Sequence, residues 1–207
     1  MAHVGMTEQE IRERLAAIVG ESLRIDPARV TDDAYLNDLG AESLDLLEIT
    51  MEAEDQFNVL FPQKTILQIA QETFGEGVLV RDGHLTEEGL KLLRRRTPEV
   101  DSLFGTDSEA TLADVNRMFL RVGVWVRMIH GLMEHSPREC PQCGTAFGKA
   151  VAGRLKCSQC ATEREITPGD ELNRRWVSDY YEEACVPTAA TVAAVPAPTG
   201  PDPMPAA

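Results

Sequence analysis

The sequence predicts a mainly α-helical protein with a small metal-bound module near its C-terminal end. Apolar residues recur at helical spacing in three stretches, at about residues 8–23, 43–57 and 111–129. Four of the five cysteines form two CxxC pairs, which are separated by thirteen residues. The 207 residues, 43% of them apolar, suffice for one medium domain or two small ones.

The first helix has clear local signals at its start. Thr7 is the expected N-cap of a helix from about Glu8 to Leu23, and Glu10 completes a capping box. Pro27 and Gly40 then interrupt the periodicity, so a long loop is expected before the second helix.

The second helix, expected at about residues 43–57, lies in the most acidic part of the chain. Between Val30 and Gln63 there are nine acidic residues and no Lys or Arg, and the whole chain has a net charge of −14. This charge argues against general binding to nucleic acid or anionic membranes and favours partners with basic surfaces. The helix has an apolar stripe and acidic residues mostly off that stripe. The stripe is Leu44, Leu47 and Met51, and the acidic residues are Asp45, Glu48, Glu52 and Asp55.

The middle of the chain predicts smaller elements. QKTILQIAQETF (63–74) holds a short helix, and Asp82-Gly83 is the turn signal of a small hairpin. Thr86 is the expected cap of a basic helix, EEGLKLLRRR. A further strong helix opens at Thr111, with these apolar residues at helical intervals: Leu112, Val115, Phe119, Val122, Val126 and Ile129.

The segment DLGAESLDLLEITMEAEDQFNVLFP (38–62), preceded by a helix of suitable length, resembles an acyl carrier protein. Members of that family have a Gly, one variable residue, Asp-Ser-Leu, an acidic helix and a Phe-to-Pro exit. The matching residues are Gly40, Ser43, Leu44, Asp45, Glu48, Phe57, Phe61 and Pro62. The resemblance implies a four-helix bundle with 4′-phosphopantetheine esterified to Ser43, whose thiol holds an acyl group as a thioester.

The resemblance also implies partners, namely a phosphopantetheinyl transferase and acyl-transferring and ketosynthase-type enzymes with basic docking patches. Leu44 and Met51 would help to wall an acyl pocket or its rim. Glu42 stands where the family usually has Asp, so its carboxylate moves by one methylene, which alters the fit to the modifying synthase. The residues expected to dock partners are Glu42, Leu44, Asp45, Glu48, Met51 and Glu52.

Elementary physical chemistry supports this role for Ser43. A phosphodiester at a helix N-terminus meets free backbone N–H groups and the positive end of the helix dipole. An acidic helix behind it speeds encounter with basic enzyme surfaces. The alternative is that Ser43 only caps the helix, which is the better interpretation of an isolated serine before an apolar run.

The last helix of the carrier is expected to be displaced. We place the third helix in KTILQIA and the fourth from Thr111, so that about residues 71–110 are an insertion. The alternative fourth helix, 87–96, has a poor apolar stripe, and its basic residues could fold onto the acidic helix, contact an acidic partner or remain solvated. The expected organisation is a carrier-like domain (7–135), a zinc ribbon (136–168), a C-terminal helix (169–185) and a disordered Pro/Ala-rich tail (186–207).

The two CxxC pairs predict one tetrahedral metal site, because each pair lets two thiolates approach an ion from a tight knuckle. The segment resembles a zinc ribbon. CPQCG is also similar to rubredoxin, so iron is the alternative, although Ala161 replaces a rubredoxin glycine. The mixed charge favours a structural staple or protein-docking module over nucleic-acid binding. The expected ligands are Cys140, Cys143, Cys157 and Cys160.

We therefore expect a non-catalytic acyl carrier in fatty-acid, polyketide or related synthesis. The alternative is a carrier-like scaffold or regulatory protein that binds a partner or nucleic acid through its ribbon. A cytoplasmic location is expected, because no secretory signal is visible and paired CxxC motifs then indicate metal. Arg121 and Arg127 interrupt the most apolar late segment, so no membrane span is expected, and Cys185 is expected to be an incidental thiol.

Overall fold

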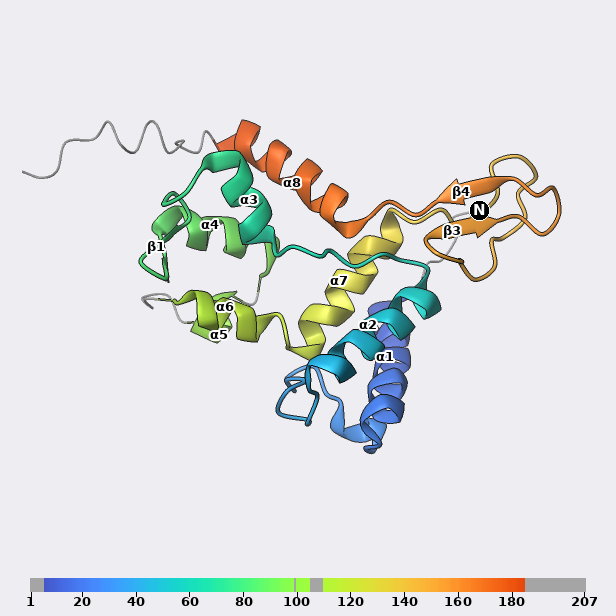
Figure 1. Ribbon diagram of the computed structural model, residues 1–207, viewed down its shortest axis with the longest axis horizontal. Coiled ribbons are helices and arrows are strands. Elements are labelled where there is room, and N and C mark those ends of the chain that lie inside the picture. The colour runs from blue at the N-terminus through green and yellow to red at the C-terminus, as the bar shows by residue number, and fades with distance from the viewer. Residues whose placement is uncertain (1–5, 99, 105–109, 185–207) are drawn as a thin grey trace, which may run out of the picture.

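The computed structural model describes residues 6–98, 100–104 and 110–184, and it is mainly α-helical (Figure 1). This confirms the fold class that the sequence predicts. Cys185 and the tail at 186–207 lie outside the described residues. The helices are α1 (Glu8–Leu23), α2 (Ser43–Phe57), α3 (Ile66–Phe74), α4 (Glu87–Arg96), α5 (Val100–Phe104), α6 (Leu112–Met118), α7 (Val122–Glu134) and α8 (Gly169–Ala184), with a short 3-10 turn at Pro27–Arg29.

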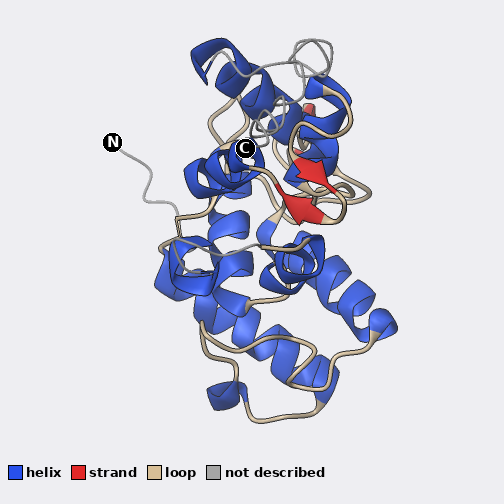
Figure 2. Cartoon of the chain, turned by 90° about the vertical axis from the view of Figure 1, so that its left-hand side faces the viewer, coloured by secondary structure: helices blue, strands red, loops and turns tan. Residues whose placement is uncertain are grey.

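In the part of the chain that the structure describes, the strands form two short antiparallel hairpins (strands are red in Figure 2). In the first, β1 (Val80–Arg81) pairs with β2 (His84–Leu85) across the expected Asp82-Gly83 turn. In the second, β3 (Arg154–Lys156) pairs with β4 (Glu163–Glu165). Strand β3 lies between the two CxxC pairs in the sequence, and β4 follows the second pair. Among the residues that the structure describes, no helix has the length and apolar character needed to cross a membrane.

The first hydrophobic core joins α1, α2 and α7. Helix α1 begins with the expected capping box, in which Thr7 Oγ1 accepts from Glu10 N–H at 3.2 Å and Glu10 Oε2 accepts from Thr7 N–H at 2.7 Å. Phe61, just beyond α2, packs edge-on against Trp125 of α7 with ring centroids 5.3 Å apart. The buried helical residues of this core include Ile11, Leu15, Val19, Ile49, Ala53, Phe57, Val122, Val126 and Ile129.

A second core joins α3, the β1–β2 hairpin and α4 to α5, α6 and α8. Phe74 at the end of α3 is buried, and its ring lies 5.5 Å from that of Tyr181 on α8. Helix α4 lies here and does not close the first core. Residues of the expected insertion therefore share one core with elements from both sides of it. The buried members include Ile69, Phe74, Leu79, Leu92, Leu93, Val115, Met118 and Val177.

The arginines of α4 contact α5 and α8 and not the acidic helix α2, while Lys91 pairs with Glu87 and Glu88 of α4 itself. Arg94 pairs with Asp101 of α5, and Arg95 pairs with Glu183 of α8. Arg96 donates to Asn173 at 3.1 Å and lies over the Trp176 ring, 5.3 Å from its centroid. The arginines of this basic run therefore all have partners within the chain.

The single helix expected from Thr111 is wrong, because the chain divides it into α6 and α7. At the break, residues 119–121, backbone carbonyls that would accept hydrogen bonds within a continuous helix accept them from other groups. Leu120 C=O accepts from Leu36 N–H at 2.9 Å, and Phe119 C=O accepts from Trp125 Nε1–H at 2.8 Å. As a result α6 packs in the second core, while α7 packs in the first with all its buried large side chains except Val124. The apolar period continues through the break, so periodicity alone could not show it.

The cysteine module, residues 136–168, has a small core of its own. Ala150, Leu155 and Ile166 are buried together, with Phe147 and Leu60 packed against them. Leu60 belongs to the segment after α2, so the module packs against the part of the chain that leaves α2. We call this module the ribbon. In Figure 1 the ribbon lies at one end of the longest axis, the β1–β2 hairpin and α4 lie at the other end, and α7 runs between them.

Candidate functional site

Ser43 is the first residue of α2, and its side chain is exposed. The N-cap is Glu42, whose backbone N–H donates to Asp45 Oδ2 at 2.8 Å. None of the hydrogen bonds found among the described residues uses the Ser43 hydroxyl. The interpretation of Ser43 as the helix cap therefore does not hold, and its hydroxyl is accessible at the start of the helix.

The loop before Ser43 is held in place by buried anchors. Leu36 is buried and its N–H bonds Leu120 C=O, while Ala41 N–H bonds Leu36 C=O, each at 2.9 Å. Gly40 has φ = 104°, a conformation that side-chain-bearing residues rarely adopt. The motif glycine is thus required by the turn that leads into α2.

The same loop is tied to α1 and α7 through Asp32. Arg12 of α1 donates to both Asp32 carboxylate oxygens, at 2.5 and 2.8 Å. Gly123 N–H donates to Asp32 C=O at 3.0 Å, and a Cβ at Gly123 would lie only 3.1 Å from that oxygen. These contacts fix the entry to α2 relative to the first core.

The outward face of α2 is apolar and acidic. Leu44, Leu47 and Met51 are 80%, 57% and 59% exposed. The buried face of the helix is a different stripe, formed by Ile49, Ala53 and Phe57. Leu44 and Met51 therefore point to solvent and not into the first core. We call Leu44, Leu47, Met51, Glu48 and Glu52 together the α2 outer face.

Cations neutralise the ends of the acidic segment but not its middle. The paired acids are Asp32 with Arg12, Asp33 with Arg121, Asp38 with Arg117 and Asp55 with Lys149. Glu54 is half-buried and accepts from Phe61 N–H at 2.7 Å, and burial raises its pKa. In the described part of the chain no ion pair reaches Glu42, Glu48 or Glu52. Their negative charge is therefore left to act on a partner.

Comparison with known proteins decides the family. Residues 13–75 match the family model described as "Phosphopantetheine attachment site". An acyl carrier protein of Guillardia theta is 46% identical over 66 residues, which are 31% of this chain and 82% of that protein. The chain belongs to the acyl carrier protein family. An acyl carrier protein of Prochlorococcus marinus (strain MIT 9515) is 36% identical over 74 residues, 35% of this chain and 90% of that protein. No solved structure matches the chain.

The matched segment is the carrier motif, and it ends with α3. Helix α7, which packs against α1 in the first core, lies beyond it. The relatives cover about a third of the chain, and of the second core only α3 lies in the matched segment, so the other elements of that core and the ribbon lie outside it.

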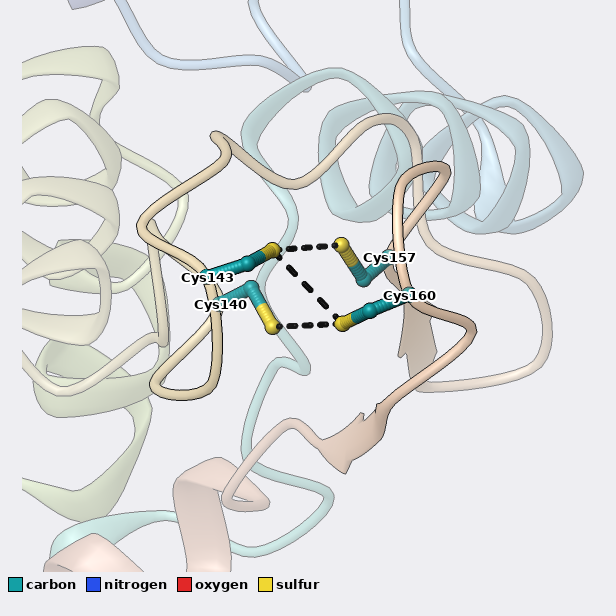
Figure 3. Close-up of side chains that lie close together, drawn as sticks. All are labelled: Cys140, Cys143, Cys157 and Cys160. Atoms are coloured by element: carbon teal, nitrogen blue, oxygen red, sulfur yellow. Dashed lines mark hydrogen bonds between the residues drawn. The ribbon is translucent and has the colours of Figure 1, made fainter.

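The four predicted cysteines come together at a second site (Figure 3). Cys140 Sγ lies 3.5 Å from Cys160 Sγ, and Cys143 Sγ lies 3.5 Å from Cys157 Sγ. All four Sγ atoms lie within 4.8 Å of one another. Tetrahedral zinc with Zn–S bonds of about 2.3 Å places its sulfurs about 3.8 Å apart, whereas a disulfide needs about 2.05 Å. The cluster fits a zinc ion.

The two knuckles have the same backbone pattern. Cys140 C=O accepts from Gly144 N–H at 2.8 Å, and Cys157 C=O accepts from Ala161 N–H at 3.0 Å. Gly144 and Ala161 both have positive φ, 72° and 60°. Burial raises the pKa of the Cys140 thiol, but the backbone N–H groups of Gln142 and Cys143 and the nearby thiols outweigh it and lower the pKa to about 6. The backbone N–H of Cys160 lowers the pKa of the Cys157 thiol, but burial and the Cys143 and Cys160 thiols outweigh it and raise the pKa to about 11. A thiolate is the form that binds metal.

The ribbon is attached to the carrier through Asn58, the residue that ends α2. Asn58 Nδ2–H donates to Gly148 C=O at 3.1 Å, and Asn58 Oδ1 accepts from Ala150 N–H at 2.7 Å. Its own C=O accepts from the Ser136 hydroxyl at 2.7 Å. Lys149 Nζ adds an ion pair to Asp55, 3.0 Å away.

Sequence reasoning missed Asn58, although one signal was present. Asn58 has φ = 52°, and asparagine is the residue other than glycine that most readily adopts this conformation at a helix end. What the sequence could not show is that its amide reaches residues ninety positions away.

Proposed function

We propose that this carrier bears 4′-phosphopantetheine on Ser43 and serves fatty-acid, polyketide or related biosynthesis without being an enzyme itself. The observation that supports it most directly is an exposed, uncommitted serine hydroxyl at the first position of α2, with Glu42 providing the cap. When bound, the phosphopantetheine supplies the thiol that holds an acyl group as a thioester.

The chain's own residues then have three tasks. The backbone N–H groups of the first turn of α2, and the helix dipole, stabilise the phosphodiester. The anchored loop keeps Ser43 at a fixed position relative to the first core. The α2 outer face docks the transferase and the acyl-transferring and ketosynthase-type enzymes through apolar contact and attraction to basic side chains.

Modification by a broad-specificity phosphopantetheinyl transferase with coenzyme A tests this function. Intact-mass measurement should show one phosphopantetheine on the wild type and none on Ser43→Ala. Ser178→Ala removes another exposed helical serine, on α8, and should keep the adduct. An unmodified wild type, or an adduct that survives Ser43→Ala, would contradict the proposal.

We propose zinc as the metal of the ribbon. Four thiolates suit zinc, and the ribbon's own apolar core is so small that metal binding must provide most of its stability. Metal analysis of protein purified without added metal should find one zinc for each chain. Bound iron, visible by its absorption, would contradict the assignment. Thiolates of this kind persist in reducing compartments, which supports a cytoplasmic location.

The ribbon's firm attachment at Asn58 favours a second candidate, a carrier-like scaffold that acts through the ribbon. The two functions respond differently to substitution. The carrier function is lost in Ser43→Ala. The scaffold function survives Ser43→Ala and is lost in Cys157→Ser.

A further inference from the structure

The large apolar side chains that are most exposed in the described part of the chain lie on the α2 outer face and at one point of the ribbon. Among the large apolar residues that the structure describes, Leu44, at 80%, and Val151, at 77%, are the most exposed. Val151 opens a tight turn in which its N–H and C=O both bond to Arg154, at 2.9 and 3.0 Å. The turn residues, Ala152 and Gly153, have φ of 49° and 72°. The valine is thus presented on a closed two-residue turn. We call residues 148–153 the ribbon loop.

The ribbon loop has a fixed position beside α2. Besides the two Asn58 hydrogen bonds, Gly153 packs so closely on Leu60 that a Cβ there would lie 3.1 Å from Leu60 Cδ1. Leu60 lies in the segment that leaves α2. Its C=O accepts from the N–H of Gly169, the first residue of α8, at 2.9 Å. One side of the loop is therefore held by the carrier, while Val151 remains exposed.

The contacts of residues 148–150 place the ribbon loop at the end of α2. Gly148 C=O and Ala150 N–H both bond the Asn58 amide. Lys149 contacts Asp55, which lies one helical turn beyond Met51. The ribbon loop, in which Val151 is exposed, therefore adjoins the end of the α2 outer face.

A protein interface of ordinary size is large enough to include both the α2 outer face and the ribbon loop. Helix α2 has 15 residues, which makes it about 22 Å long. A standard interface covers about 800 Å² on each partner, a patch roughly 30 Å across. A protein that covers Ser43 and follows the α2 outer face along the helix would reach the ribbon loop.

We propose that the α2 outer face and the ribbon loop form one docking surface for the phosphopantetheinyl transferase that modifies Ser43. The inference rests on the proposed function. The matching surface of the transferase has an apolar patch opposite Met51 and Val151, flanked by Lys or Arg opposite Glu48 and Glu52. The ribbon then takes part in partner recognition, beyond its own folding.

The test measures kcat/KM for phosphopantetheine transfer from coenzyme A to the full-length, zinc-loaded chain. Val151→Lys should lower kcat/KM about fivefold or more, mainly through KM, because it places a cation against a basic, apolar partner surface. Met51→Lys should act in the same direction. Leu112→Lys is the matched control, since Leu112 is an exposed apolar residue on α6 in the second core, and it should leave kcat/KM unchanged.

Zinc content and circular dichroism verify that each variant is folded, and Val151→Ser replaces Val151→Lys if that variant loses zinc. Hydrogen exchange of Ser43→Ala with the transferase and coenzyme A gives a second readout, in which amides 148–153 should become protected. Wild-type transfer with unchanged kcat/KM in the Val151 variant and no protection of the ribbon loop would overturn the inference. No transfer to the wild type would instead contradict the proposed function.

Discussion

Replacing Asn58 by glycine should loosen the ribbon from α2 without straining the backbone. Asn58 has φ = 52° and ψ = 52°, which glycine adopts at no steric cost. The substitution removes two side-chain hydrogen bonds, of 2.7 and 3.1 Å, to the ribbon loop. At about 0.5–1.5 kcal/mol for each bond, the attachment should weaken by about 1–3 kcal/mol.

Asn58→Ala is the matched variant, because it removes the same two bonds but, unlike glycine, keeps a Cβ in the left-handed region. That conformation costs a further 1–2 kcal/mol, roughly, for a residue other than glycine. The alanine variant should therefore be less stable than the glycine variant, and the difference separates backbone strain from hydrogen bonding.

Native-state hydrogen exchange of the zinc-loaded protein measures the effect. A loss of about 1–3 kcal/mol corresponds to roughly 5- to 150-fold faster opening of the ribbon loop amides, Ala150 above all. Amides in α4, in the second core, should exchange as in the wild type. Unchanged exchange at Ala150 in Asn58→Gly would refute the idea that this amide attaches the ribbon.

Three further substitutions test the cores and the knuckles. Ile49→Ala should destabilise the fold by about 2–5 kcal/mol in urea unfolding, because Ile49 is fully buried, whereas Met51→Ala should change it by less than about 0.5 kcal/mol; equal costs would contradict the orientation of α2. Ala161→Gly should raise the thermal stability of the zinc-loaded ribbon and Gly144→Ala should lower it, since both positions have positive φ; a drop in Ala161→Gly would argue against the knuckle geometry. Burial raises the pKa of Glu54, so the folded state binds this proton more tightly than the unfolded state, and the carboxylate costs stability above its raised pKa. In the wild type the free energy of unfolding should therefore rise as the pH falls from that raised pKa toward about 4.5, and in Glu54→Gln this rise should be smaller. The same pH dependence of unfolding in both proteins would contradict the burial of Glu54.

Local signals predicted much of the fold and the candidate site. The capping box at Thr7, the Asp82-Gly83 turn and the two CxxC pairs each depend on residues a few positions apart, and all three occur as expected. The sequence also placed α2 correctly, because Gly40 interrupts the chain before it and apolar residues recur at helical spacing from Leu44.

The orientation of α2 could not be predicted, because the helix has two apolar stripes. Leu44, Leu47 and Met51 form one, and Ile49, Ala53 and Phe57 form the other. Hydrophobicity alone does not say which stripe faces the core. The choice is made by α1 and α7, which lie far away in the sequence.

The break between α6 and α7 and the attachment of the ribbon have the same kind of cause. Leu120 gives up its helical hydrogen bond for Leu36, and Asn58 bonds residues of the ribbon loop. Both depend on tertiary partners that a pattern within one segment does not contain.

Peptide mapping of the modified protein tests the central claim most directly. Because no Lys or Arg occurs between Val30 and Gln63, trypsin releases residues 30–64 as one peptide, and Ser43 is its only serine. After incubation with coenzyme A and the transferase, this peptide should carry the phosphopantetheine, and fragment ions should place it on Ser43. An adduct on any other peptide, or on Thr31 or Thr50 within this one, would contradict the account.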